Sequence, residues 1–303
     1  MALYARLETQ SPNPRRRGCW IVGGVTVMVL FAASCSSSPG PGSSGAAAAG
    51  SAQAQASAAP IKLLRPLKPL TQPSARCGAP HAKATLVRFK AADGAPLDGV
   101  MVGSGTAGVV LAHEYANDLC GAWPFANYLA KRGLRVFAID MRCFGRSACP
   151  AGGAAGRVAD DLAAAAAELR HRGVTKVALV GASMGGSAAL IAATRARPPV
   201  AAVVSLSGQA NPTTLLHLPL NARAAVPQLT VPAMFVVANL DQYTSVDETR
   251  AMYQAAKTTD KRLLVLPGDF NGFHGWQVLT NVGGGFSATA AKVAEFIAAH
   301  TGS

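Results

Sequence analysis

The chain has 303 residues, of which 50% are hydrophobic and 14% are charged, and its formal net charge is +13. A half-apolar composition can bury a sizeable core and excludes a disordered or fibrous chain. Beyond residue 60 the basic residues stand singly or in pairs, without an aromatic–basic motif, so the charge does not predict a nucleic-acid partner. The basic excess instead favours anionic surroundings such as a lipid headgroup layer.

The first 35 residues have the pattern of an export signal. Three arginines at 15–17 precede an apolar run over 18–34, and small residues end it. The end of the run, Ala-Ala-Ser before Cys35, resembles a bacterial lipobox, in which the cysteine is lipidated. An uncleaved signal anchor and a soluble secreted form are the alternatives. All three predict a domain outside the cytoplasmic membrane, held there by lipid or secreted.

Residues 36–74 are predicted to be a flexible tether, because Ala, Gly, Ser and Pro dominate their first half and no periodic bulky residues occur there. One domain is expected over 75–303. Four of the six cysteines fall beyond the signal, and in an oxidising compartment they allow three pairings. Cys143 and Cys149 bracket a short turn, which makes their pairing plausible and leaves Cys77 for Cys120. No His, Cys or Asp cluster has metal-ligand spacing, so neither a metal nor a cofactor is expected.

The domain begins with a predicted hairpin around Asp93 and Gly94, followed by alternating strands and helices. Short, continuous apolar runs between amphipathic helices indicate a parallel sheet that is covered on both faces. The expected class is α/β, with a doubly wound, mostly parallel sheet. Strands are predicted over 85–90, 97–102, 108–112, 134–140, 176–181, 200–206, 231–238 and 262–266, and helices over 123–132, 158–170, 187–195, 246–256 and 286–300.

Ser183 is the candidate nucleophile. It lies in the sequence Gly-Ala-Ser-Met-Gly, a G-x-S-x-G pattern between a predicted strand and a predicted helix. Such a turn exposes the serine above the helix N-terminus, where free amides can stabilise an oxyanion.

Asp241 and His274 follow later strands, in the order Ser, Asp, His. A base must take the serine proton, and a carboxylate must orient that base. Loops at the carboxyl ends of parallel strands bring such residues together. Asp247 and Asp269 are the substitutes for Asp241, and His113 is the competitor of His274 but is expected to have a structural role.

Over residues 85–300 the chain resembles the α/β-hydrolase family. The matching pieces are the serine turn, the Phe-His-Gly-Trp sequence around His274, the Asn-Leu-Asp turn that ends at Asp241, the strand that ends at His113, and the turn at 140–147. Within the family, the compact layout is similar to serine versions of dienelactone-hydrolase-type esterases. The resemblance implies an oxyanion hole formed by the N–H groups of Met184 and Tyr115. Two positions that are often glycine in the family are Glu114 and Cys143 here, and the carboxylate of Glu114 weakens the assignment of Tyr115.

No large cap domain is expected, because only about twenty residues separate the strands on either side of 209–231. The site should therefore be open and shallow. Its candidate walls are Trp123, Leu215, Leu216, Leu218, Phe273 and Trp276.

The sequence thus predicts an exported, membrane-tethered serine hydrolase that cleaves a small-molecule or envelope ester through an acyl-enzyme. Cleavage of amides or peptides by the same three residues is one alternative. A non-catalytic binding module on the same fold is the other, and replacing Ser183 by alanine separates the two classes.

Overall fold

A computed structural model describes residues 62–70, 77, 84–153, 157–212 and 218–303. The contacts divide the chain into two units, residues 1–56 and 57–303, and all described residues belong to the second. The expected signal, Cys35 and the first part of the expected tether lie outside the described residues. Among the described helices, none is long and apolar enough to cross a membrane.

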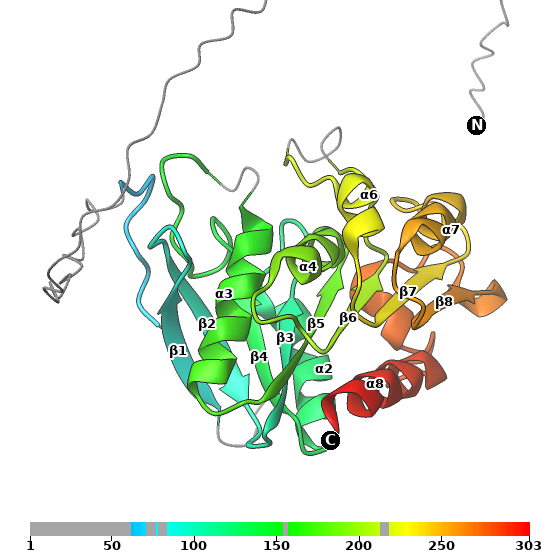
Figure 1. Cartoon of the computed structure of the whole chain (residues 1–303), viewed down its shortest axis with the longest axis horizontal. Coiled ribbons are helices and arrows are strands. Elements are labelled where there is room, and N and C mark those ends of the chain that lie inside the picture. The colour runs from blue at the N-terminus through cyan, green and yellow to red at the C-terminus, as the bar shows by residue number, and fades with distance from the viewer. Residues whose placement is uncertain (1–61, 71–76, 78–83, 154–156, 213–217) are drawn as a thin grey trace, which may run out of the picture. The chain divides into compact units, whose positions relative to one another are not determined.

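The centre of the domain is an eight-stranded sheet with the strand order β1-β2-β4-β3-β5-β6-β7-β8 (Figure 1). The first two strands form an antiparallel hairpin, β2 also pairs antiparallel with β4, and every other pair is parallel. The doubly wound, mostly parallel sheet is therefore confirmed. The strands are β1 (Thr85–Lys90), β2 (Pro96–Val102), β3 (Ala107–Ala112), β4 (Arg135–Asp140), β5 (Lys176–Ala182), β6 (Ala202–Leu206), β7 (Ala233–Ala238) and β8 (Lys261–Leu266).

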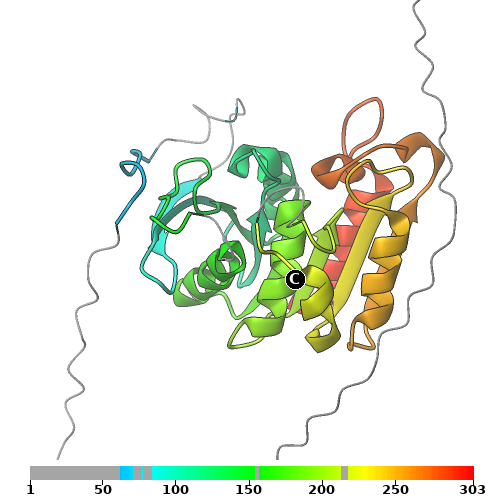
Figure 2. The ribbon, with the colours of Figure 1, turned by 90° about the horizontal axis from the view of Figure 1, so that it is seen from above.

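Helices cover both faces of this sheet (Figure 2). Each face has its own apolar cluster. The first cluster packs α3 (Val158–His171), α4 (Met184–Arg195), α6 (Ala222–Ala225) and α7 (Val246–Ala255) against one face. The second packs α2 (Leu119–Ala130) and α8 (Ala288–Thr301) against the other. Strands buried on both faces need apolar side chains throughout, which explains their continuous apolar runs.

Helix ends account for most differences from the predicted elements. α2 begins at Leu119, four residues before the expected start, because Asp118 caps it by accepting a hydrogen bond from the N–H of Cys120. α4 begins directly after Ser183 instead of at residue 187. Three short 3₁₀ helices were not predicted: η1 (Val226–Gln228), η2 (Gly268–Phe270) and η3 (Gly275–Leu279).

Both disulfides join the cysteines that the spacing favoured, Cys77 with Cys120 and Cys143 with Cys149. Cys143 has a φ of 68°, a left-handed conformation that favours glycine. A residue without a side chain would adopt this conformation more easily, and the disulfide holds the cysteine that occupies the position.

Residues 62–70 run along the loop that this second disulfide closes. The N–H of Leu64 donates to the carbonyl of Cys149 at 2.7 Å, and Leu63 forms an isolated antiparallel bridge with Pro150. These residues fall within the range expected to be a tether, and the described ones among them contact the domain.

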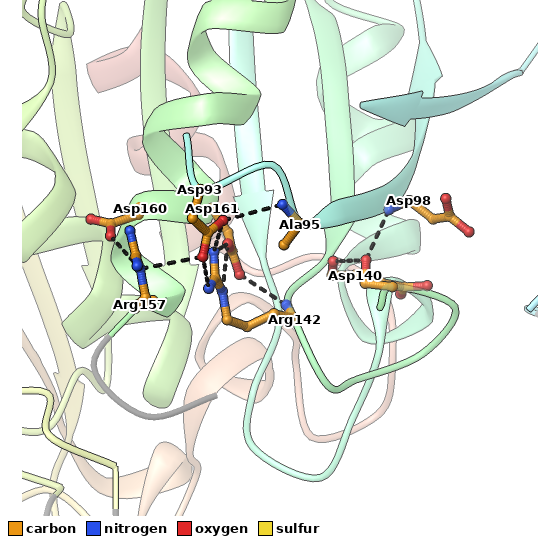
Figure 3. A network of polar contacts seen from close by, with 9 residues as sticks. Asp93, Ala95, Asp98, Asp140, Arg142, Arg157, Asp160 and Asp161 are labelled. Carbon is orange, nitrogen blue, oxygen red and sulfur yellow. Dashed lines mark hydrogen bonds and ion pairs between the residues drawn. The ribbon is translucent and has the colours of Figure 1, made fainter. Parts of the chain in front are cut away.

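A buried ion-pair network ties the end of β4 to α3 and to the β1–β2 turn (Figure 3). Arg142 donates to Asp161 through Nε at 2.8 Å and Nη2 at 2.6 Å, and through Nη1 to Asp93 at 2.8 Å. Burial raises the pKa of Asp161 to about 6, although the hydrogen bonds from Arg142 act in the opposite direction. Burial opposes ionisation of Asp93 too, but there Arg142 outweighs it and the pKa is lowered.

Candidate active site

Ser183 occupies a sharp turn between β5 and α4. Its φ of 52° and ψ of −118° lie outside the regions that residues with side chains normally adopt. Two backbone hydrogen bonds hold this conformation: the N–H of Ser183 donates to Leu206 at 2.9 Å, and its carbonyl accepts from Ser187 at 3.0 Å. Such strain is stored where the surrounding structure fixes the backbone, and it often marks a functional residue.

The two glycines of the G-x-S-x-G pattern are required by close backbone contacts. A Cβ atom on Gly181 would lie 2.0 Å from the carbonyl oxygen of Gly185. A Cβ atom on Gly185 would lie 2.3 Å from the carbonyl oxygen of Ala112. The turn can therefore pack against its own helix and against the end of β3 only with glycine at both positions.

His274 and Asp241 form a hydrogen-bonded pair on the loops that follow β8 and β7. The Nδ1 atom of His274 lies 2.9 Å and 3.0 Å from the two carboxylate oxygens of Asp241. Ser183 follows β5, so all three residues leave the sheet at its carboxyl edge, where a doubly wound sheet binds ligands. Among the described residues no hydrogen bond joins Ser183 Oγ to His274.

The Asp241 carboxylate is fully buried and held by its own loop. Its Oδ1 atom accepts hydrogen bonds from the N–H groups of Tyr243 at 2.9 Å and Thr244 at 3.1 Å. Thr244 in turn donates to the carbonyl of Ser207, and Gln209 donates to the carbonyl of Tyr243. These contacts fix the loop after β7 to the loop after β6. Of the predicted substitutes, Asp247 instead pairs with Arg250 on the surface of α7.

His113 is buried in the core at the end of β3. Its Nε2 accepts a hydrogen bond from the N–H of Met141 at 3.1 Å, so the ring proton must reside on Nδ1. Nδ1 lies 2.6 Å from the carbonyl oxygen of Glu114 and donates to it. His113 is therefore a neutral structural link between the loops after β3 and β4, and it does not compete with His274.

Glu114 links the β3 loop to the histidine loop. Its carboxylate accepts a hydrogen bond at 2.8 Å from the N–H of Trp276, two residues after His274. Gly275 has a φ of 56°, and a Cβ atom there would lie 1.8 Å from Glu114 Oε1. The glutamate thus sits directly against the histidine loop. Sequence reasoning noticed Glu114 only as a departure from the family pattern, since nothing local to it indicates a partner 162 residues away.

The two expected oxyanion donors are the N–H groups of Met184 and Tyr115. Met184 is the first residue of α4, and the first N–H groups of a helix have no partner within it. Tyr115 follows Glu114 in the β3 loop, and its ring is 45% exposed and packs edge-on against Phe144. Met184 and Tyr115 follow the adjacent strands β5 and β3, so both lie at the carboxyl edge of the sheet.

The expected walls of the site divide into core residues and residues near the surface. Trp123 is 1% exposed and packs in the core between α2 and the sheet, so it does not line an open pocket. Trp276 and Leu218 are also buried, and Phe273 is partly buried. Leu215 and Leu216 lie outside the described residues. Between β6 and β7 the described residues form only α6 and η1, and no cap domain occurs there.

The described part of the chain contains no group of three His, Cys, Asp or Glu side chains arranged to hold a metal ion. The side chains brought to the carboxyl edge of the sheet are those of the serine, the histidine and the aspartate. Their arrangement can activate a hydroxyl and accept its proton.

An eight-stranded sheet of this order, with a serine in the turn after β5, defines the α/β-hydrolase fold. The sequence family described as an alpha/beta hydrolase fold matches residues 109–230. This match spans the strand that ends at His113 and the serine turn, and ends before Asp241 and His274.

Similar proteins agree on the fold. The chain is 32% identical over 111 residues to the uncharacterized protein YfhR of Escherichia coli K12, a match that covers 33% of this chain and 38% of the relative. An esterase of Pyrococcus furiosus has a TM-score of 0.60 at 17% identity, covering 80% of this chain and 98% of the esterase. A dienelactone hydrolase from Anabaena variabilis has a TM-score of 0.57 at 23% identity, covering 72% and 98%. At such identities the likeness concerns the fold.

Proposed function

We propose that the protein is a serine hydrolase that cleaves carboxylic esters. One observation carries the proposal: the strained serine turn and the hydrogen-bonded His274–Asp241 pair lie at the same edge of the sheet. The esterases and lactonases among the proteins of similar fold support an ester as the substrate.

In the first half of the reaction, Ser183 Oγ attacks the ester carbonyl while His274 Nε2 takes its proton. Asp241 holds the imidazole through Nδ1 and stabilises the positive charge that develops. The oxyanion accepts hydrogen bonds from the N–H groups of Met184 and Tyr115. His274 then passes the proton to the leaving alcohol, and an acyl-enzyme remains on Ser183.

In the second half, His274 removes a proton from water, which attacks the acyl-enzyme. The proton returns to Ser183 when the acid is released. This mechanism needs a hydrogen bond between Ser183 and His274, and such catalytic hydrogen bonds are often long in the free enzyme and shorten when substrate binds.

The test is labelling of the full-length protein with a fluorophosphonate probe, which reacts only with an activated serine. We expect labelling of the wild-type protein and none of Ser183→Ala or His274→Ala. Ser104→Ala is the matched control, because Ser104 is exposed in the loop between β2 and β3 and should leave labelling unchanged. Labelling of Ser183→Ala, or none of a folded wild-type protein, would contradict the proposal.

We also propose that the protein is exported and anchored by lipid at Cys35. The signal-like N-terminal pattern supports export, and so do the two disulfides, which form in oxidising compartments. An alkyne-bearing fatty acid fed to expressing cells should be incorporated into the wild-type protein and not into Cys35→Ala. Wild-type protein recovered from the membrane without the label would exclude the lipid anchor.

A further inference from the structure

A cavity of about 640 Å³ lies at the carboxyl edge of the sheet, beside the candidate active site. Three segments form its walls: the stretch over 62–70, the loop over 116–118 after β3, and the loop over 143–146 after β4. The cavity involves neither Ser183 nor His274, so it is a feature separate from the proposed catalytic residues.

The cavity is lined by three cations, Arg65, Lys68 and Arg146, and by a single carboxylate, Asp118. That carboxylate is already used at the N-terminus of α2, where it accepts from the N–H of Cys120. In the described part of the chain, no carboxylate lies within ion-pair distance of any of the three cations. The lining therefore carries three cations against one carboxylate, and the buried carboxylate of Asp140 lies behind the loop that holds Arg146.

Backbone contacts hold the cations over the loop after β4. Lys68 Nζ donates to the carbonyl of Gly145 at 3.1 Å, and an Arg65 Nη2 hydrogen donates to the carbonyl of Cys143. The N–H of Arg146 donates to Asp140. A lysine has three donors and an arginine five, so these contacts leave most of the donors available to a ligand.

The place of the cavity relative to Ser183 follows from the strand order. Ser183 follows β5, its neighbour β3 carries Tyr115, and the next strand, β4, carries the cation loop. Neighbouring strands lie about 4.8 Å apart, so two spacings separate the carboxyl ends of β4 and β5 by roughly 10 Å. Phe144 lies in the cavity wall and packs edge-on against Tyr115, which follows β3, the strand next to that of Ser183.

We propose that this cavity binds the anionic end of the substrate, which would then be an ester with a carboxylate or phosphate group roughly 10 Å from its reacting carbonyl. The inference rests on the proposed function, because Ser183 must act on the ester. An acyl chain of about eight carbons spans the two strand spacings. Its ester carbonyl would lie at Ser183, its chain would cross Tyr115 and Phe144, and its anion would meet Arg146.

Binding to full-length Ser183→Ala tests the inference without turnover. Isothermal titration would compare monomethyl suberate, which has an ester at one end and a carboxylate at the other, with the neutral dimethyl suberate. We expect the monoanion to bind more tightly, by about two- to fivefold for each cation that it contacts. Added salt should weaken binding of the monoanion alone. Equal affinities for the two compounds would overturn the proposal.

One substitution and its control test whether Arg146 binds the anion. Arg146→Gln should lower affinity for the monoanion by about two- to fivefold and leave the neutral diester unaffected. Arg132→Gln is the matched control, since Arg132 follows α2 at the opposite edge of the sheet and the substitution removes the same charge. An unchanged preference for the monoanion in Arg146→Gln would overturn the assignment. The affinity for inorganic phosphate is measured in the same way. If phosphate binds more tightly than the monoester, and this binding depends on Arg146, the cavity is a site for a free anion and the proposal is overturned.

Hydrolysis by the wild-type protein separates this inference from the proposed function. The p-nitrophenyl ester of suberic acid should have a higher kcat/KM than the same ester capped with methanol at its far end. Hydrolysis of both at equal rates would overturn the anion site and leave the serine hydrolase standing. Binding of the monoanion without any hydrolysis would overturn the serine hydrolase, and with it the substrate role of the cavity, and would leave only an anion-binding cavity.

Discussion

The contact between Glu114 and the histidine loop leads to a prediction about catalysis. The carboxylate accepts the N–H of Trp276 at 2.8 Å and lies against Gly275, so it holds the backbone directly after His274. Replacing Glu114 by alanine removes this contact and should displace the imidazole from the serine. The residue does not touch the reacting atoms, so its effect should come through the position of His274.

The size of the effect can be worked out from the contact. A hydrogen bond to a charged group contributes about 1.5–3 kcal/mol, and the half-buried position of Glu114 favours the lower end. The side chain of Trp276 packs near Phe125 of α2, which should keep part of the loop in place. A loss of about 1.4 kcal/mol corresponds to a tenfold lower kcat/KM.

Initial rates with a neutral p-nitrophenyl ester, together with the melting temperature, provide the assay. Glu114→Ala should lower kcat/KM about tenfold, mainly through kcat, whereas Glu114→Gln keeps an acceptor oxygen and should lose only about threefold. Glu295→Ala, an exposed substitution on α8, controls for loss of a surface charge. If Glu114→Ala kept wild-type kcat/KM while remaining folded, the contact would have no part in positioning His274.

Three further predictions concern stability. Arg142→Met leaves Asp161 buried without its ion-pair partner and should lower the unfolding free energy by about 3–5 kcal/mol. Urea titration measures this loss, and a loss below about 1 kcal/mol would refute the prediction. Because burial raises the pKa of Asp161 to about 6, the folded chain holds this proton more tightly than the unfolded chain. The unfolding free energy relative to Asp161→Asn should therefore fall by up to about 3 kcal/mol as the pH rises from about 4 to about 6, and a difference independent of pH would contradict the shift. Replacing Cys143 and Cys149 together by alanine opens a short loop and should cost about 2 kcal/mol by the chain-entropy relation, checked by the shift in melting temperature.

The sequence predicts the fold well because each buried strand is a short apolar run that needs no information from elsewhere in the chain. Both disulfides were predicted, since Cys143 and Cys149 are close enough in sequence for their pairing to be plausible. The start of α2 was misplaced because a helix boundary depends on a side-chain cap, here Asp118, and not on the apolar pattern.

The site was only partly predictable. Ser183 stands out because the elbow needs glycines at fixed offsets, and the structure brings Asp241 and His274 into contact as their order suggests. Trp123 was misread as a pocket wall because a large aromatic side chain near a site has the same sequence signature whether it faces the core or the solvent. The role of Glu114 could not be predicted, because its partner is a backbone N–H 162 residues away. Every residue except proline has such a group, so the residue types do not indicate which one is the partner.

The two ends of the described domain leave it at opposite edges of the sheet. Residues 62–70 lie beside the loop after β4, at the carboxyl edge, whereas Gly302 lies next to Lys176 at the start of β5. Immobilisation chemistry would therefore have two distinct results. A bead or electrode coupled close to residue 62 would face the edge that carries Ser183 and restrict the approach of bulky substrates. The same support coupled at the carboxyl terminus would leave that edge open to solution.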